Sequence, residues 1–411
     1  MLTIYRIFIN IIFILSPIII LIRLIYKKED IRRFKEKIGF FKKKKLKGKL
    51  IWFHGASVGE LKSVLPIIEK LIKNSAVDQI LITSNTLSSS KIAKKIESKK
   101  IIHQFFPIDT NFISKKFIKY WKPSKVIFID SEIWPNTIKN LKENGIPIYL
   151  LNARITKKTF EKWFFFKKIA KEIFLSFNLF LTSNIETIRY LKKLSAKNIK
   201  YIGNLKFSET EEKNLKINNK FKKFCIKKKI WCASSTHDNE EIICGTAHLK
   251  LKKKIKNIFT IIIPRHIERS KNIKINLEKM GLKVHLDSSQ KSILKDTDIY
   301  LVDSYGKTKL FFNESKIVFL GGSLIDHGGQ NPIEAARLGC KILAGKNIYN
   351  FKEIYQFLKK KNILQYVHDS KTLAKKINLF LNKDTSSENI KKQINYLGKK
   401  ILDKTYKELN F

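Results

Sequence analysis

Short apolar runs alternate with longer amphipathic segments along most of this chain. The apolar runs are continuous, which is typical of strands in a parallel sheet covered by helices on both faces. The pattern predicts strands in the first half at residues 50–54, 79–83, 103–106, 125–130, 147–151, 179–182 and 199–202. Helix-length segments separate them, among them residues 61–73, 88–97 and 161–174.

The same pattern starts again after a polar stretch. Residues 208–229 are predicted to connect two domains, and residues 387–411 to form a helix that could cross back to the first one. Further strands are expected at 230–233, 259–263, 283–286, 299–303, 316–320 and 341–344. The predicted fold is therefore α/β, with two Rossmann-like domains (residues 27–207 and 230–386) that face a cleft.

The first 26 residues follow neither pattern. Residues 7–22 carry no charge and form a helix of about 24 Å, and the flanks from 4 to 26 extend it towards a hydrocarbon core of about 30 Å if Arg6 and Arg23 reach the interface. No small-residue cleavage site follows, and the basic cluster after Arg23 favours a cytoplasmic body. We expect residues 1–26 to be an uncleaved membrane anchor, rather than a signal peptide or a core helix, that spans the bilayer or lies in one leaflet.

Composition adds charge to this picture. The 411 residues carry a formal net charge of +48, spread along the whole chain rather than gathered in one stripe. Enrichment in Ile, Asn and Lys together is typical of an AT-rich genome, and part of the excess suits an anionic membrane face. A nucleic-acid binder would show aromatics interleaved on a basic strand face, which this sequence does not. The four cysteines form no C-x-x-C pair and the eight histidines no metal-ligand spacing, so we predict neither metal nor cofactor.

Three loops of the first half carry candidate chemistry. Residues 51–68 run from a strand through a small-residue turn to Glu60 at a helix start, where Glu60 is either a helix-favouring carboxylate or a general base. In residues 128–139, a strand delivers Glu132 to a turn closed by Trp134 and Pro135, which suits either capping or the cleft. Lys206 follows the last strand just before the polar connection.

Two loops of the second half suit a phosphate. Pro264 and Arg265 follow a strand, where a guanidinium can pair with phosphate in a fork geometry. Residues 319–339 contain two glycine pairs, Gly321–Gly322 and Gly328–Gly329, before a helix start at Asn331–Pro332 that carries Glu334. Glycine-rich turns before a helix predict a phosphate cradle, and the early Glu suits ribose hydroxyls.

Six motifs, in this order, resemble the family of 3-deoxy-D-manno-octulosonic acid (Kdo) transferases of lipopolysaccharide synthesis. They are H-x-x-S-V-G-E (54–60), S-E-I-W-P-N (131–136), N-A-R (152–154), G-N-L-K-F (203–207), P-R-H (264–266) and G-G-S-L…G-G-x-N-P-x-E-A-A (321–336). The resemblance covers essentially the whole chain. It implies a GT-B glycosyltransferase that moves Kdo from CMP-Kdo to a tetra-acylated lipid A precursor with inversion, on the cytoplasmic side of the bacterial inner membrane.

The resemblance also implies roles for single residues. Glu60 resembles the family's general base, and Glu132 and Lys206 resemble its transition-state stabilisers. The residues that resemble the CMP site are Pro264, Arg265, Tyr305, Gly306, Lys307, Asn331, Pro332, Ile333 and Glu334. Lys307 departs from the family, which usually has an acidic residue there. No metal is implied, since Arg, Lys and helix-end N–H groups can offset the charge of the leaving phosphate. The alternatives are another GT-B sugar-nucleotide enzyme such as a 2-epimerase or, in a different class, a basic membrane-associated nucleic-acid binder.

Overall fold

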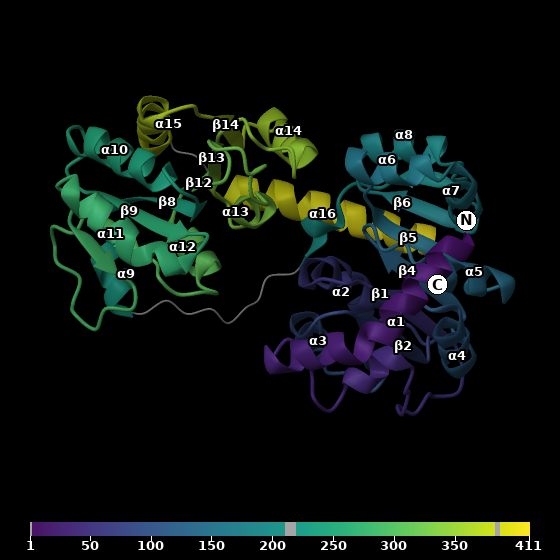
Figure 1. The fold of residues 1–411 in the computed structure, drawn as a ribbon. Helices are drawn as coiled ribbons and strands as arrows, with labels where there is room; N and C mark the ends of the chain where they lie inside the picture. Colours follow the sequence, from purple (N-terminus) through teal and green to yellow (C-terminus); the bar gives the residue numbers. More distant parts are fainter. Residues whose placement is uncertain (1, 210–218, 383–386) are drawn as a thin grey trace. The chain divides into compact units, whose positions relative to one another are not determined.

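The computed structural model describes residues 2–209, 219–382 and 387–411. The chain divides into two compact units: a first unit of Met1–Thr210 with Leu397–Phe411, and a second unit of Glu211–Tyr396. Each unit is a parallel sheet with helices packed against it (Figure 1). The second half of helix α16 (Ser387–Leu409) packs with the first unit, where Asp403 pairs with Lys70 at 2.5 Å and Glu408 with Lys200 at 2.5 Å.

The sheet of the first unit has seven parallel strands in the order β3-β2-β1-β4-β5-β6-β7. The strands are β1 (Leu50–His54), β2 (Gln79–Ser84), β3 (Ile101–Phe105), β4 (Lys125–Ile129), β5 (Ile148–Ala153), β6 (Leu179–Thr182) and β7 (Ile199–Tyr201). All residues of β1, β2 and β4 are buried, as their continuous apolar runs require. Strand order reverses between β1 and β4, so the loops after these two strands diverge there.

Several helices of this unit begin after a residue whose side chain caps them. The helices are η1 (Phe34–Ile38), α2 (Val58–Ile72), α3 (Leu87–Lys94), α4 (Asn111–Trp121), α5 (Pro135–Glu143), α6 (Lys157–Phe165), α7 (Lys167–Phe174), α8 (Ile185–Lys193) and η2 (Leu205–Ser208). Ser57, Thr86 and Thr110 cap α2, α3 and α4 with their side-chain oxygens. Trp134 makes no side-chain cap for α5, which has Pro135 in its first turn instead.

The sheet of the second unit is also parallel and seven-stranded, in the order β10-β11-β9-β8-β12-β13-β14. The strands are β8 (Lys229–Thr236), β9 (Ile258–Pro264), β10 (Val284–Leu286), β11 (Ile299–Leu301), β12 (Ile317–Leu320), β13 (Lys341–Ala344) and β14 (Leu364–Tyr366). The other elements are α9 (Asn219–Cys225), α10 (Glu240–Lys252), η3 (Ile267–Arg269), α11 (Ser270–Lys279), α12 (Thr308–Glu314), α13 (Ile333–Arg337), α14 (Lys352–Lys360) and α15 (Ser370–Asn382). Here the strand order reverses between β8 and β12.

The predicted fold class is confirmed, because both halves form parallel α/β sheets with the expected strands. Strand β14 was not predicted, and the helix expected at 161–174 is split at Phe166. Of the expected connection 208–229, residues 210–218 lie outside the described residues. Its described remainder is partly helical, and Phe221 of α9 is 4% exposed and packs 4.7 Å from the ring of Tyr300.

Helix α1 (Leu2–Ile25) lies along the first unit (Figure 1). Its length and composition would allow it to cross a membrane. Ile9, Ser16 and Ile20 are buried on one stripe of the helix, at the spacing of a helix face, whereas most other side chains are exposed and apolar. Arg6 and Arg23 both bond to protein groups. Arg6 donates to Asn136 and Asn111, and Arg23, whose side chain is 41% exposed, donates to Glu29 at 2.6 Å.

Candidate active site

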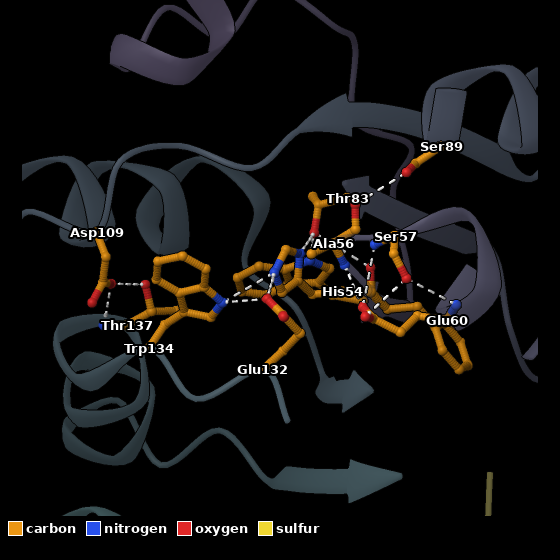
Figure 2. Close-up of polar contacts among 12 residues, drawn as sticks. His54, Ala56, Ser57, Glu60, Thr83, Ser89, Asp109, Glu132, Trp134 and Thr137 are labelled. Atoms are coloured by element: carbon orange, nitrogen blue, oxygen red, sulfur yellow. Dashed lines mark hydrogen bonds and ion pairs between the residues drawn. The ribbon is translucent and has the colours of Figure 1, made fainter. Parts of the chain in front are cut away.

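The loops after β1 and β4 flank the strand-order reversal of the first unit. In a parallel sheet, ligands bind outside the carboxyl ends of the strands at such a reversal. His54 is the last residue of β1, and Asp130 and Glu132 follow β4 directly. Figure 2 shows His54, Glu132 and Trp134 close together on one side and Ser57 and Glu60 on the other side of His54.

Glu60 forms a capping box at the start of α2. Its Oε2 accepts from the backbone N–H of Ala56 at 2.6 Å and of Ser57 at 3.3 Å, and its Oε1 accepts from the Ser57 hydroxyl at 2.9 Å. The Ser57 hydroxyl in turn accepts from the Glu60 N–H. These three donors occupy three of the roughly four acceptor positions of a carboxylate. Glu60 therefore caps α2, and its carboxylate can still accept one more hydrogen bond.

Glu132 is paired with His54. His54 Nε2 lies 3.1 Å from Glu132 Oε2, and the indole N–H of Trp134 donates to the same oxygen at 2.9 Å (Figure 2). On the other side of the ring, His54 Nδ1 lies 2.9 Å from the Thr83 hydroxyl. The Trp134 indole N–H also lies 3.1 Å from His54 Nε2. Because an ionised Glu132 only accepts, the His54–Glu132 contact requires the proton on Nε2, and the indole N–H then donates to Glu132. His54 is fully buried, so its ring holds the Glu132 carboxylate in one place.

The pKa of the Glu132 carboxyl is lowered despite its burial. Burial alone raises this pKa, but the hydrogen bond and charge of His54 and the hydrogen bond of Trp134 outweigh it. Glu132 is therefore an anion at neutral pH, which suits the stabilisation of positive charge that develops beside it.

Asp130 is a carboxylate on which several charged side chains of this site act. Burial raises its pKa to about 6, and the charges that act on it most are those of Lys206, Glu60, Arg154 and Glu132. Its backbone has φ 62°, a left-handed conformation that a non-glycine residue adopts rarely. The charges of Glu60, Glu132 and Lys206 thus all act on one carboxylate that sequence reasoning did not assign. The sequence feature that could have identified Asp130 is its position as the first carboxylate after a buried strand.

An apolar cavity of about 970 Å³ lies beside this cluster in the first unit. Trp134 belongs to both, since its indole N–H bonds to Glu132 while the residue lines the cavity. The lining comes from α1, from the start of α5 and from α6–α7: Ile4, Tyr5, Phe8, Ile133, Trp134, Pro135, Thr159, Glu161, Lys162, Trp163, Phe165, Phe166 and Ile169. Such a volume holds a small ligand or one part of a larger one.

In the second unit, basic side chains gather after strands β8, β9 and β12. The rings of His237 and His327 stack at 4.3 Å, and His266 lies 5.9 Å from His237. Burial lowers the pKa of His237 to about 4, and the neighbouring histidines and the charges of Arg265 and Arg269 add to this effect. The Nε2 of His237 is buried and has no hydrogen-bond partner within the described part of the chain. Such a cluster favours an anionic ligand. Sequence reasoning placed Arg265 here but missed His237.

The first glycine pair does not offer its amides to a ligand. The carboxylate of Glu240, at the start of α10, accepts from the N–H groups of Gly322 at 2.7 Å, Ser323 at 3.2 Å and Leu324 at 3.0 Å. It also accepts from the His237 N–H at 3.0 Å. In this first part of the predicted phosphate cradle, the amides therefore bind a buried carboxylate of the protein.

The glycines of this loop are still required by its backbone. A side chain at Gly321 would come within 2.5 Å of the Ser235 carbonyl oxygen, and Gly322, Gly328 and Gly329 all have positive φ. Of the residues after the glycines, Asn331 accepts from the Ile333 N–H at 3.2 Å beside Pro332, and Glu334 pairs with Lys309 at 3.4 Å. These two contacts order the start of α13.

The remaining predicted residues lie on exposed loops. Arg265 is exposed after Pro264 at the end of β9, and its N–H donates to the Thr236 carbonyl oxygen. Tyr305 donates to Glu268 at 3.0 Å, and Gly306 has φ 85°. Lys307 pairs with Asp287 at 2.6 Å, so this departure from the family pattern has a partner within the second unit. Within residues 2–209, 219–382 and 387–411, no group of three or more His, Cys, Asp or Glu side chains is arranged to hold a metal ion.

The sequence of this chain is similar to those of known transferases. A family model of 3-deoxy-D-manno-octulosonic-acid transferases matches residues 32–209. The chain is 33% identical over 404 residues to a 3-deoxy-D-manno-octulosonic acid transferase of Rickettsia bellii, which covers 95% of both chains. It is 28% identical over 345 residues to the enzyme of that name from Haemophilus influenzae, over 83% of this chain and 81% of the relative.

Solved structures show the same architecture at low sequence identity. A UDP-GlcNAc 2-epimerase of Neisseria meningitidis matches with a TM-score of 0.58 at 13% identity, over 87% of this chain and 100% of the epimerase. A glycosyltransferase of Rickettsia africae matches with a TM-score of 0.55 at 14% identity, over 88% and 99% of the two chains. Identities this low show the fold alone, which agrees with the predicted GT-B class.

Proposed function

The chain belongs to the 3-deoxy-D-manno-octulosonic acid transferase family, and on that basis we propose that it transfers Kdo from CMP-Kdo to a lipid A precursor with inversion at the anomeric carbon. The observation that carries this proposal is that the charges of Glu60, Glu132 and Lys206 act together on Asp130, which follows β4 at the strand-order reversal of the first unit. A base, a fixed anion and a cation close to one another are what such a transfer requires.

The proposed reaction assigns each of these groups one task. Glu60 takes the proton from a hydroxyl of the acceptor as that oxygen bonds to the anomeric carbon of Kdo. The bond from this carbon to the phosphate oxygen of CMP breaks on the opposite face, and its electron pair leaves with CMP. Glu132, held by His54 and Trp134, stabilises the positive charge that develops on the sugar. Lys206 stabilises negative charge, either on the Kdo carboxylate or on the leaving group.

We assign the donor to the second unit. Arg265 supplies positive charge for the phosphate, and the stacked histidines, among which His237 has a lowered pKa, supply ring N–H donors. The residues that resemble the family's CMP site, Pro264, Arg265, Tyr305, Gly306, Lys307 and Asn331 to Glu334, belong to loops around this cluster. Lys307 contributes mainly through its pair with Asp287, which orders its loop.

The lipid acceptor is supported by the apolar surfaces of the first unit. The cavity beside Trp134 can take an acyl chain, and the exposed face of α1 is apolar along its length. The end of α6 and its junction with α7 expose Phe164, Phe165 and Phe166 among the lysines of residues 157–171. Aromatic and basic side chains together are typical of an interface with anionic lipid. Because α1 buries one stripe against the unit, we propose that it lies in the cytoplasmic leaflet of the inner membrane.

Purified protein incubated with CMP-Kdo and a tetra-acylated lipid A precursor tests the proposal. Product mass should increase by one or more Kdo units, and CMP should raise the melting temperature whereas an oligonucleotide should not. Absence of any Kdo-bearing product from folded protein that binds CMP would refute the assigned acceptor. Absence of CMP binding would refute the assigned donor.

A further inference from the structure

Asp109 is a buried carboxylate that the proposed reaction does not use. It is 1% exposed and lies in the loop between β3 and α4. Its Oδ1 accepts from the N–H of Thr137 at 2.8 Å and from the Thr137 hydroxyl at 2.5 Å, and its Oδ2 accepts from the N–H of Asn136 at 3.0 Å. These are amides of the first turn of α5, which Trp134 does not cap. Asp109 therefore caps α5 from outside the helix.

The amino-terminal helix α1 completes this arrangement. The Tyr5 hydroxyl donates to Asp109 Oδ2 at 2.8 Å. Arg6 Nε donates to Asn136 Oδ1 at 2.9 Å, and the Asn136 amide donates to the carbonyl oxygen of Asp109 at 2.7 Å. Tyr5 and Arg6 thus bind the same turn through two separate routes.

That turn carries the group that holds Glu132. Trp134 directly precedes α5, and its indole N–H bonds to Glu132 Oε2 (Figure 2). A chain of hydrogen bonds thus leads from the Tyr5 hydroxyl through the Asp109 carboxylate to the start of α5, which this tryptophan directly precedes. A helix that served purely as an anchor could dock through its buried stripe of Ile9, Ser16 and Ile20. The polar contacts of Tyr5 and Arg6 fix the α5 start in addition.

We propose that α1 is a positioning element of the active site, in which Tyr5 and Arg6, through Asp109 and Asn136, fix the turn that aims Trp134 at Glu132. This inference rests on the proposed function, because it concerns the orientation of Glu132 during Kdo transfer. It adds a role in the active site to the membrane anchor that the sequence predicts. Tyr5 and Asp109 are positioning residues, since neither is proposed to touch the substrate.

The test is Tyr5→Phe in the full-length protein, which removes one hydroxyl and keeps the apolar ring. With detergent-dispersed acceptor, where membrane binding is not limiting, kcat should fall about ten-fold, or about 1.4 kcal/mol, while KM for CMP-Kdo stays within about two-fold. Tyr26→Phe is the matched control, because Tyr26 follows α1 and is 69% exposed. It should retain the parent kcat.

A double-mutant cycle with Trp134→Phe separates positioning from general destabilisation. If Tyr5 acts through Trp134, then Tyr5→Phe should cost little further activity once the indole N–H is absent. A double mutant whose fold-loss in kcat equals the product of the two single losses would overturn the proposal. An unchanged kcat in Tyr5→Phe would also overturn it. An inactive parent protein would instead refute the proposed function.

Fluorine NMR of 5-fluorotryptophan protein provides a readout that does not depend on activity. The chain has five tryptophans, and Trp134→Phe identifies the signal of Trp134. Tyr5→Phe should shift or broaden this signal and leave that of Trp231, in the second unit, unchanged. A Trp134 signal identical to that of the parent protein would also overturn the proposal, even if Tyr5→Phe lowered activity for another reason.

Discussion

Glu60→Gln separates the two roles that the Glu60 side chain can have. The glutamine oxygen can replace Oε2 and keep the bonds from the N–H groups of Ala56 and Ser57. Its NH₂ group replaces Oε1 and can donate to the Ser57 hydroxyl, which at present donates to Glu60 at 2.9 Å. Glutamine at this position also forms capping boxes. The substitution therefore preserves the cap and removes the ability to accept a proton.

The two roles predict effects of different size. If Glu60 is only a cap, Glu60→Gln loses the charge–dipole interaction at the start of α2, about 0.3–1 kcal/mol of stability, and kcat changes by no more than a few-fold. If Glu60 is the general base, kcat falls by about 10²–10⁴. Glu60→Ala should do both, since it also removes the cap at a cost of about 1 kcal/mol.

The assay combines initial rates of Kdo transfer with thermal unfolding and CMP binding. We expect Glu60→Gln to bind CMP like the parent protein, because Glu60 belongs to the first unit and Arg265 to the second. Glu69→Gln, an exposed carboxylate on the same helix, is the control and should leave kcat unchanged. A kcat within a few-fold of the parent in Glu60→Gln would refute the general-base role and leave the cap as the function of this residue.

Three further predictions test other parts of the structure. Arg265→Ala should weaken binding of CMP by about 1.5–3 kcal/mol, and an unchanged dissociation constant in calorimetry would contradict its assignment. Glu240→Gln should lower the free energy of unfolding by about 2–4 kcal/mol, because its NH₂ group would face backbone N–H donors; denaturant titration measures this. For Asp130, the folded-state pKa of about 6 exceeds the unfolded value of about 3.9, so its ionisation lowers native stability as the pH rises from about 4 to 6. Asp130→Asn has no carboxyl group to ionise and therefore does not lose this stability. The Tm of Asp130→Asn minus the Tm of the parent should increase across that window. A constant difference would contradict the raised pKa.

Strand positions were predictable from the sequence because burial on both faces leaves a continuous apolar run, as in Leu50–His54, which matches β1 at both ends. Strand β14 was missed because Leu364–Tyr366 is a three-residue edge strand whose last two residues are only partly buried. The break at Phe166 was missed because the local sequence on both sides of it is helical. Local pattern does not record such effects of packing.

Site residues that directly follow strands were predictable for a related reason. Glu132 and Arg265 follow strands, and the carboxyl ends of parallel strands share one edge of a sheet. His54 and Asp130 lay within the same motifs but received no role, because their contacts depend on Thr83 and Lys206, which are distant in the sequence.

The least predictable feature is common to both units: a buried carboxylate from a distant segment binds the backbone amides of a site loop. Asp109 binds the first turn of α5, and Glu240 binds the glycine turn after β12, 82 or more residues away in the sequence. A sequence shows that such amides need an acceptor but not whether a ligand or the protein supplies it. Since the protein supplies it in both places, the loops that carry Trp134 and the first glycine pair are ordered before any substrate binds. Substrate binding then does not bear the entropic cost of ordering these loops, which is the advantage of a site held by its own surrounding residues.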